Sequence, residues 1–121
     1  MFYTSYFGNL RNIPDHVVPV AICLNKPASW NGFHMPKVAP LPYMIASAKQ
    51  GNTELAAKDY RELLSRLDAD EVIEEAIDLT ESEDIVFVCY EKPEDWCHRH
   101  EFAKWLSMRG YKCIEWKNYN C

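Results

Sequence analysis

Several chemically reactive residue types lie close together in the C-terminal third of the sequence. Cys89 and Glu91 end an apolar run, and Cys97, His98 and Arg99 follow after a short turn. Thiols, imidazoles and carboxylates are the groups that enzymes use for nucleophilic attack and proton transfer, and a guanidinium binds carboxylates or phosphates. The segment therefore predicts a catalytic site in which Cys97 or Glu91 acts as nucleophile or base and His98 transfers protons.

The position of this cluster at the start of a helix supports that interpretation and also allows simpler ones. Asp95 is a suitable N-cap, so Cys97 falls in the first helical turn, where the helix dipole favours a thiolate. Cys97 can equally be a small buried residue, and His98, which shares the face of Phe102, can be a hydrogen-bonded core residue. Arg99 either holds an anion with the helix amides or forms an ion pair with a nearby carboxylate.

Residues at the ends of the earlier strands are expected to reach the same place. In open α/β sheets, ligands bind beyond the carboxyl ends of the strands. A long aromatic loop follows the second strand, and loops of that length are often binding loops, although a surface loop pinned by its aromatic residues is the alternative. The predicted substrate-binding residues are Arg99, Cys89, Thr4, Ser5, Asn25, Lys26 and Trp30.

Hydrophobic patterning predicts the elements that position these residues. Short apolar or β-branched runs indicate strands, and apolar residues at helical spacing indicate helices. The strongest strand is 85–90, which we expect at the centre of the sheet. Strands are expected at 1–6, 17–24, 85–90 and 111–116, helices within 41–79 and at 95–109, and a loop at 25–42. The fold class is α/β: a single domain over residues 1–121, with a mostly parallel sheet of about four strands flanked by helices in three layers.

Composition and charge exclude several classes of function. Apolar residues form 48% of the chain, which predicts a packed core, and the net charge of −5 makes general coating of nucleic acid unlikely. The longest apolar run is far shorter than the roughly 20 residues of a membrane-spanning helix. The start of the sequence lacks a signal-peptide pattern, so we expect a cytoplasmic protein. No glycine motif for phosphate or dinucleotide binding is present, and no cofactor is predicted.

The five cysteines leave a metal site as an alternative. In a reducing compartment, thiols or metal ligands are expected rather than a disulfide framework. Cys89, Cys97, His98 and His100 are candidate zinc ligands, with Cys23 or His34 completing the set. Their spacing matches the usual structural zinc patterns poorly, so a structural zinc protein is the weaker hypothesis.

The segment from Val86 to Arg99 resembles the C-terminal signature of the domain of unknown function 488 family. In that family a hydrophobic strand ends in Cys-x-Glu and a helix opens with Cys-His-Arg. The N-terminal half is also similar to shorter members, with an aromatic-Thr-Ser strand, an apolar second strand and a loop containing Trp30. Many members carry Asp-x-Arg at the end of the second strand, where this chain has the residues 23–26, Cys-Leu-Asn-Lys.

The resemblance implies an α/β fold and a shared pocket, but it supplies no activity. The residues that it places around the pocket are Cys89, Glu91, Cys97, His98 and Arg99. We therefore carry two main hypotheses: a small enzyme acting on a nucleotide-like or other anionic molecule, and a non-catalytic module that uses the same pocket to bind a ligand or a partner. The sequence makes no prediction about oligomeric state.

Overall fold

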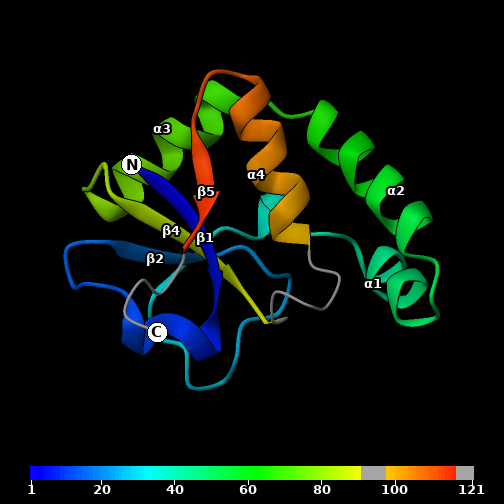
Figure 1. The fold of residues 1–121 in the computed structure, drawn as a ribbon, viewed down its shortest axis with the longest axis horizontal. Helices are drawn as coiled ribbons and strands as arrows, with labels where there is room; N and C mark the ends of the chain where they lie inside the picture. The colour runs from blue at the N-terminus through cyan, green and yellow to red at the C-terminus, as the bar shows by residue number, and fades with distance from the viewer. Residues whose placement is uncertain (91–97, 117–121) are drawn as a thin grey trace.

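The computed structural model of the protein describes residues 1–90 and 98–116. Three strands and two short 3₁₀ helices come first in this part of the chain, three consecutive α-helices follow, and a strand, an α-helix and a last strand complete it (Figure 1). The strands are β1 (Phe2–Tyr6), β2 (Val18–Ala21), β3 (Phe33–His34), β4 (Ile85–Cys89) and β5 (Cys113–Glu115). The α-helices are α1 (Pro42–Lys49), α2 (Thr53–Ser65), α3 (Ala69–Thr80) and α4 (His98–Met108), and two 3₁₀ helices are η1 (Phe7–Asn12) and η2 (Pro36–Val38).

The five strands form one parallel sheet in the order β3-β2-β4-β1-β5. Ile85 of β4 is paired with Phe2 of β1 on one side and with Val18 of β2 on the other. All five residues of β4 are buried, which confirms the prediction that this strand is central. The predicted α/β class with a parallel sheet is therefore correct. The additional strand is β3, whose two residues are too few to produce a periodic pattern.

One face of the sheet is covered by the α-helices. Alternate residues of β2 and β4, including Val20, Ile85 and Phe87, share a buried cluster with residues of the four helices. The helix α4 lies against β1 and β5 on one side and against α2 on the other (Figure 1). Because successive side chains of a strand point to opposite faces, the intervening residues face away from these helices.

The other face has a thinner cover made of η1 and the aromatic loop. Val86 and Val88 of β4 form a second buried cluster with Ala21, and side chains such as Phe7 and Trp30 pack on it. The sheet is therefore the middle one of three layers, as predicted. None of the helices in the described part of the chain has the length and apolar composition that crossing a membrane requires.

Local signals set the ends of the helices. Asp68 caps α3 by accepting hydrogen bonds from the amides of Asp70 and Glu71. The chain leaves α4 through Gly110, which has a φ of 91° that favours glycine. Two predicted strands were too long. The second covers Val18–Ala21 rather than 17–24, and the last covers Cys113–Glu115 rather than 111–116.

Candidate functional site

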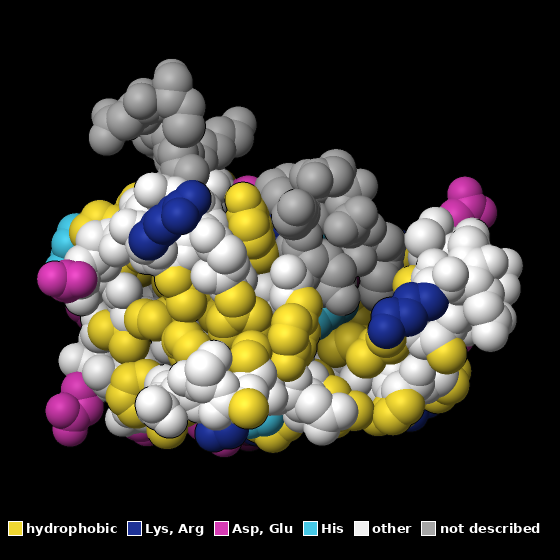
Figure 2. All heavy atoms as spheres, turned by 90° about the horizontal axis from the view of Figure 1, so that it is seen from below, with side chains coloured by type: hydrophobic (Ala, Val, Ile, Leu, Met, Phe, Trp, Pro, Cys, Tyr) yellow, Lys and Arg dark blue, Asp and Glu magenta, His cyan; other side chains and the backbone are white. Residues whose placement is uncertain are grey.

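A pocket with a volume of about 730 Å³ opens at the edge where β2 and β4 end. Figure 2 looks onto this lower edge of the molecule, where hydrophobic side chains gather across the centre. The pocket lies between the residues that follow β2, the residue that follows β4, the helices α1 and α2, and His98 at the start of α4. Its volume falls within the range of about 300–1,000 Å³ that is typical of small-molecule sites.

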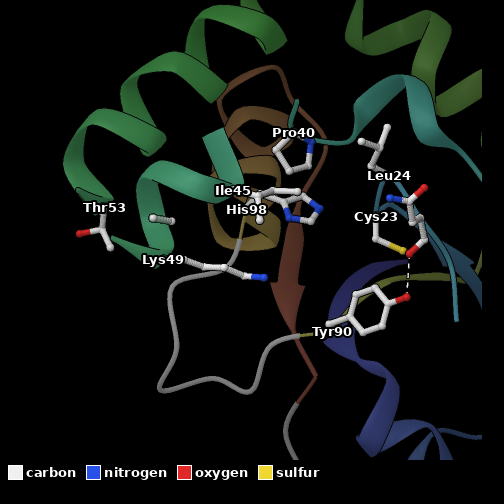
Figure 3. Close-up of a pocket in the computed structure, with 10 residues that line it drawn as sticks. Cys23, Leu24, Pro40, Ile45, Lys49, Thr53, Tyr90 and His98 are labelled. Atoms are coloured by element: carbon white, nitrogen blue, oxygen red, sulfur yellow. Dashed lines mark hydrogen bonds between the residues drawn. The ribbon is translucent and has the colours of Figure 1, made fainter. Parts of the chain in front are cut away.

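His98 is held at the inner wall of the pocket (Figure 3). The side chain is only 4% exposed, its Nε2 atom lies 2.7 Å from the carbonyl oxygen of Ile22, and its ring contacts the Tyr60 ring edge-on. Because a carbonyl only accepts, Nε2 carries the proton of the neutral ring and Nδ1 carries the lone pair. Burial lowers the pKa of His98 from 6.5 to about 4; the hydrogen bond to Ile22 opposes this, and the positive charge of Arg99 adds to it. The imidazole is therefore neutral at pH 7.

The remaining polar groups of the pocket come from three other elements. Lys49, the last residue of α1, extends its ammonium group across the pocket, and Thr53 is the first residue of α2. The hydroxyl of Tyr90 donates a hydrogen bond of 2.7 Å to the carbonyl oxygen of Asn25. Cys23 presents a thiol beside them. Among the described residues, the pocket thus offers one cation, one thiol, one neutral imidazole and an aromatic ring.

Arg99 lies in a second, separate polar cluster. Its side chain is fully buried, and its Nε atom lies 3.1 and 3.2 Å from the two carboxylate oxygens of Glu115. Thr4 donates to the same carboxylate at 2.7 Å, and Arg99 Nη1 lies 3.2 Å from the sulfur of Cys89. The guanidinium carbon is 5.6 Å from the centroid of the Tyr6 ring. Arg99 therefore neutralises a carboxylate inside the protein, and it is not among the residues that line the pocket.

The structure thus places the predicted catalytic and binding residues that it describes in more than one part of the molecule. His98 and Asn25 line the pocket, whereas Lys26 does not. Ser5 is fully buried and accepts a hydrogen bond from Asn9. The sequence predicts one pocket that contains all of these residues, whereas the structure places them in different parts, among them the pocket, the cluster around Arg99 and the core. The reason is that alternate side chains of a strand point to opposite faces of the sheet, even where several strands end at the same edge.

Trp30, another predicted binding residue, is not among the described residues that line the pocket. Its indole Nε1 donates to the carbonyl oxygen of Phe33 at 3.0 Å, and its ring meets the Phe7 ring edge-on at 5.2 Å. The aromatic loop is thus fixed by its own aromatic residues. This arrangement is the alternative that the sequence left open.

Among the described cysteines, Cys89 differs from the prediction of thiols or metal ligands. Cys89 is disulfide-bonded, whereas Cys23 and Cys113 carry thiols. The prediction of thiols or metal ligands was based on the expected compartment and on the number of cysteines. Neither indicates which cysteine sulfurs come close enough to form a disulfide. Burial, together with the Glu115 carboxylate, raises the pKa of Cys113 to about 12, so this thiol does not ionise near neutral pH.

Two predicted catalytic residues, Glu91 and Cys97, lie outside the described residues. Their proposed roles as nucleophile or base stay predictions. Within the part of the chain that is described, no three His, Cys, Asp or Glu side chains come together as a group that could hold a metal ion.

The sequence interpretation missed most of the residues that line the pocket, among them the polar residues Lys49, Thr53 and Tyr90. Lys49 and Thr53 flank the short turn between α1 and α2. The positions of Lys49 and Thr53 in the sequence do not indicate that this turn lies beside β2. Its location depends on the packing of α1 against α2 and of both helices against the core. Tyr90 could have been predicted from the sequence as a pocket residue, since it directly follows the central strand at the edge of the sheet where ligands bind.

Comparison with known proteins gives one match. A family model described as "Active DUF488-N3 subclade" matches residues 11–110 of the chain. No curated protein and no solved structure matches it.

Proposed function

The chain belongs to the DUF488 family, as the match over residues 11–110 establishes, and from this and the pocket we propose that it is an enzyme acting on a small anionic molecule. The observation that carries the proposal is the pocket at the carboxyl ends of β2 and β4, where a cation and a neutral imidazole line one cavity. The word "active" in the description of the matched family model agrees with a catalytic role.

The anionic part of the ligand is assigned to the end of the pocket formed by Lys49 and Thr53. The protein carries a net charge of −5, so an anion needs a local cation to bind. Lys49 supplies that charge, and Thr53, in the first turn of the 13-residue helix α2, adds a hydroxyl beside helix amides that favour anions. This assignment replaces the anion-binding role that the sequence predicts for Arg99.

The rest of the ligand is expected to be flat and aromatic, as a nucleobase is. Leu24, Pro40 and Ile45 form apolar parts of the wall, and the Tyr90 ring stands at the side of the cavity (Figure 3). Aromatic rings stack on any base, because every base has a π-face. A nucleoside monophosphate combines such a ring with a phosphate and is therefore the ligand class that we propose.

The chemistry is assigned to His98 together with a nucleophile. His98 is neutral at pH 7 and can accept a proton at its Nδ1 atom. The nucleophile or base is proposed to be Cys97 or Glu91, as the sequence predicts, and Cys23 is a further thiol that lines the cavity. A cytoplasmic location is part of the same proposal, since nucleotides are cytoplasmic metabolites.

A non-catalytic binding module is the second candidate, and one observation favours it. The His98 ring is fixed by its hydrogen bond to the Ile22 carbonyl and by its contact with Tyr60. Such contacts are also typical of a histidine that stabilises the core. In this alternative the pocket binds the same anion, and no bond of the ligand is broken.

Calorimetric titration with adenosine and uridine 5′-monophosphates, and with the two nucleosides, tests the proposal. We expect a monophosphate to bind at least roughly tenfold more tightly than its nucleoside, a difference of about 1.4 kcal/mol. Lys49→Ala should remove this difference, whereas Lys104→Ala, at an exposed position of α4, should keep it. Equal binding of nucleotide and nucleoside would contradict the anion assignment.

A second pair of variants tests the location of the site. Ile45→Trp should fill the pocket and abolish binding, and Leu79→Trp, at an exposed position of α3, should leave binding unchanged. Chromatography of the ligand after incubation separates the two candidate functions. Conversion that is lost in Cys97→Ser or Glu91→Gln supports the enzyme, and tight binding without conversion supports the binding module.

A further inference from the structure

We propose that Cys89 is a redox-active cysteine: a dithiol reductant opens its disulfide, and Arg99 stabilises the Cys89 thiolate that is released. This inference is independent of the ligand proposed for the pocket. It rests on the contact between a fully buried guanidinium and the sulfur of a disulfide-bonded cysteine, 3.2 Å apart.

The contact favours the reduced state because the sulfur becomes a better acceptor on reduction. In a disulfide the sulfur is neutral and accepts hydrogen bonds weakly. A thiolate in the same place carries a full negative charge and forms a charge-assisted hydrogen bond with Arg99. Both side chains have 0% exposure, so water does not screen this interaction. Burial also disfavours a thiolate, as it does at Cys113, and the proposal requires the charge of Arg99 to outweigh that penalty.

Burial also sets the direction of the exchange reaction. Because Cys89 is inaccessible, the thiolate of the dithiol must attack the other sulfur of the bond. A mixed disulfide forms on that other cysteine, and the electron pair of the broken bond leaves on Cys89. The second thiol of the reagent then closes a cyclic disulfide and releases the other cysteine. Two electrons pass from the dithiol to the protein, and one of its two protons goes to the released cysteine and the other to the solvent.

Other charged groups near Arg99 limit the size of the effect. The carboxylate of Glu115 accepts from Arg99 and opposes a second negative charge in the cluster. Tyr6 faces the guanidinium from β1, and His98 and His100 lie on the same helix as Arg99. A thiolate stabilised by Arg99 nevertheless leaves faster than an ordinary one, because a leaving group of lower pKa departs more readily.

The first experiment measures the equilibrium between oxidised and reduced Cys89. The purified protein is equilibrated at pH 7 with dithiothreitol and its cyclic disulfide in graded ratios, alkylated, and digested for mass spectrometry, which also identifies the second cysteine of the bond. Arg99→Met should lower the equilibrium constant for reduction by at least about tenfold, the change that one unit of thiolate pKa produces. Arg61→Met, which removes an arginine from an exposed ion pair, is the matched control and should have no effect.

A second measurement does not depend on the folding of Arg99→Met. The ultraviolet absorbance of thiolates in the reduced wild-type protein is titrated with pH, and the same titration of Cys89→Ser is subtracted. We expect Cys89 to ionise below the ordinary cysteine pKa of about 8.5. A pKa at or above that value, an unchanged equilibrium in folded Arg99→Met, or an unbonded Cys89 in protein purified without reductant would each overturn the proposal.

Discussion

The Nε2 atom of His98 lies 2.7 Å from the carbonyl oxygen of Ile22, and this bond joins the start of α4 to the residue that follows β2. Both residues are buried. The bond closes the inner wall of the pocket with a ring that is neutral at pH 7. It also makes the stability of the fold depend on keeping that ring neutral.

The first prediction is a loss of stability in acid that originates from His98. The folded pKa of about 4 lies below the ordinary value of 6.5, so below pH 6.5 the unfolded chain binds more protons than the folded one. Stability is complete above pH 6.5 and falls as the pH decreases toward 4, by about 3 kcal/mol in total. Urea unfolding between pH 8 and pH 4 measures this loss. His98→Gln should lose this component, His16→Gln at an exposed position should retain it, and equal slopes in all three proteins would refute the prediction.

The second prediction concerns the ion pair between the fully buried Arg99 and the partly buried Glu115. Glu115→Gln leaves the buried guanidinium without this compensating charge and should cost about 3 kcal/mol, because an uncompensated buried charge is strongly destabilising. Glu75 pairs with Lys37 at the surface, where both side chains are more than 40% exposed. Glu75→Gln should therefore cost less than about 1 kcal/mol. Comparable losses in urea unfolding would show that Arg99 does not depend on Glu115.

The role of Arg99 also shows where sequence reasoning reached its limit. A cation in the first turn of a helix is unfavourable for the helix dipole, which indicates that Arg99 has a compensating partner. The sequence suggested an anion or a neighbouring carboxylate. The actual partner, Glu115, comes beside Arg99 because β5 pairs with β1. Pairing of strands that are far apart in the sequence cannot be derived from local patterns.

The elements themselves were easier to predict than the site. The β-branched run at 85–90 and the Asp68 cap are local signals, and both correspond to observed elements. The pocket combines residues that follow β2 and β4 with residues of three helices. Of the groups in it, the sequence identified His98 and Asn25, whereas Lys49 depends on helix packing that leaves no periodic signal.

The third prediction tests the cap of α3. Asp68 accepts a hydrogen bond of 2.9 Å from the amide of Asp70, so Asp68→Ala should destabilise the protein by about 1 kcal/mol. Asp78 lies near the other end of the same helix, where a negative charge is unfavourable to the dipole. Asp78→Ala should therefore be neutral or slightly stabilising. Thermal unfolding of the two variants measures the contrast, and equal losses would show that the cap contributes nothing.

The fourth prediction concerns the reactivity of Cys113. With a pKa of about 12, only about one thiol in ten thousand is ionised at pH 8, and the side chain is only 5% exposed. The folded protein should therefore leave Cys113 unmodified by iodoacetamide under conditions that label it fully in urea. Peptide mass spectrometry measures both states. Labelling of Cys113 at similar rates in the folded and unfolded protein would contradict its burial.

The last prediction tests whether Trp30 fixes the aromatic loop. A Cβ atom added at Gly32 would lie 2.5 Å from a ring carbon of Trp30, far inside van der Waals contact. Gly32→Ala must therefore displace the indole from its bond to the Phe33 carbonyl and from the Phe7 ring, at a cost of about 1–3 kcal/mol. The indole N–H signal of Trp30 in proton NMR should shift, whereas Asn31→Ala, at an exposed position, should leave it in place. Because Trp30 is not among the described residues that line the pocket, Gly32→Ala should bind the pocket ligand as the wild type does. A loss of binding would support the substrate-binding role that the sequence predicts for Trp30.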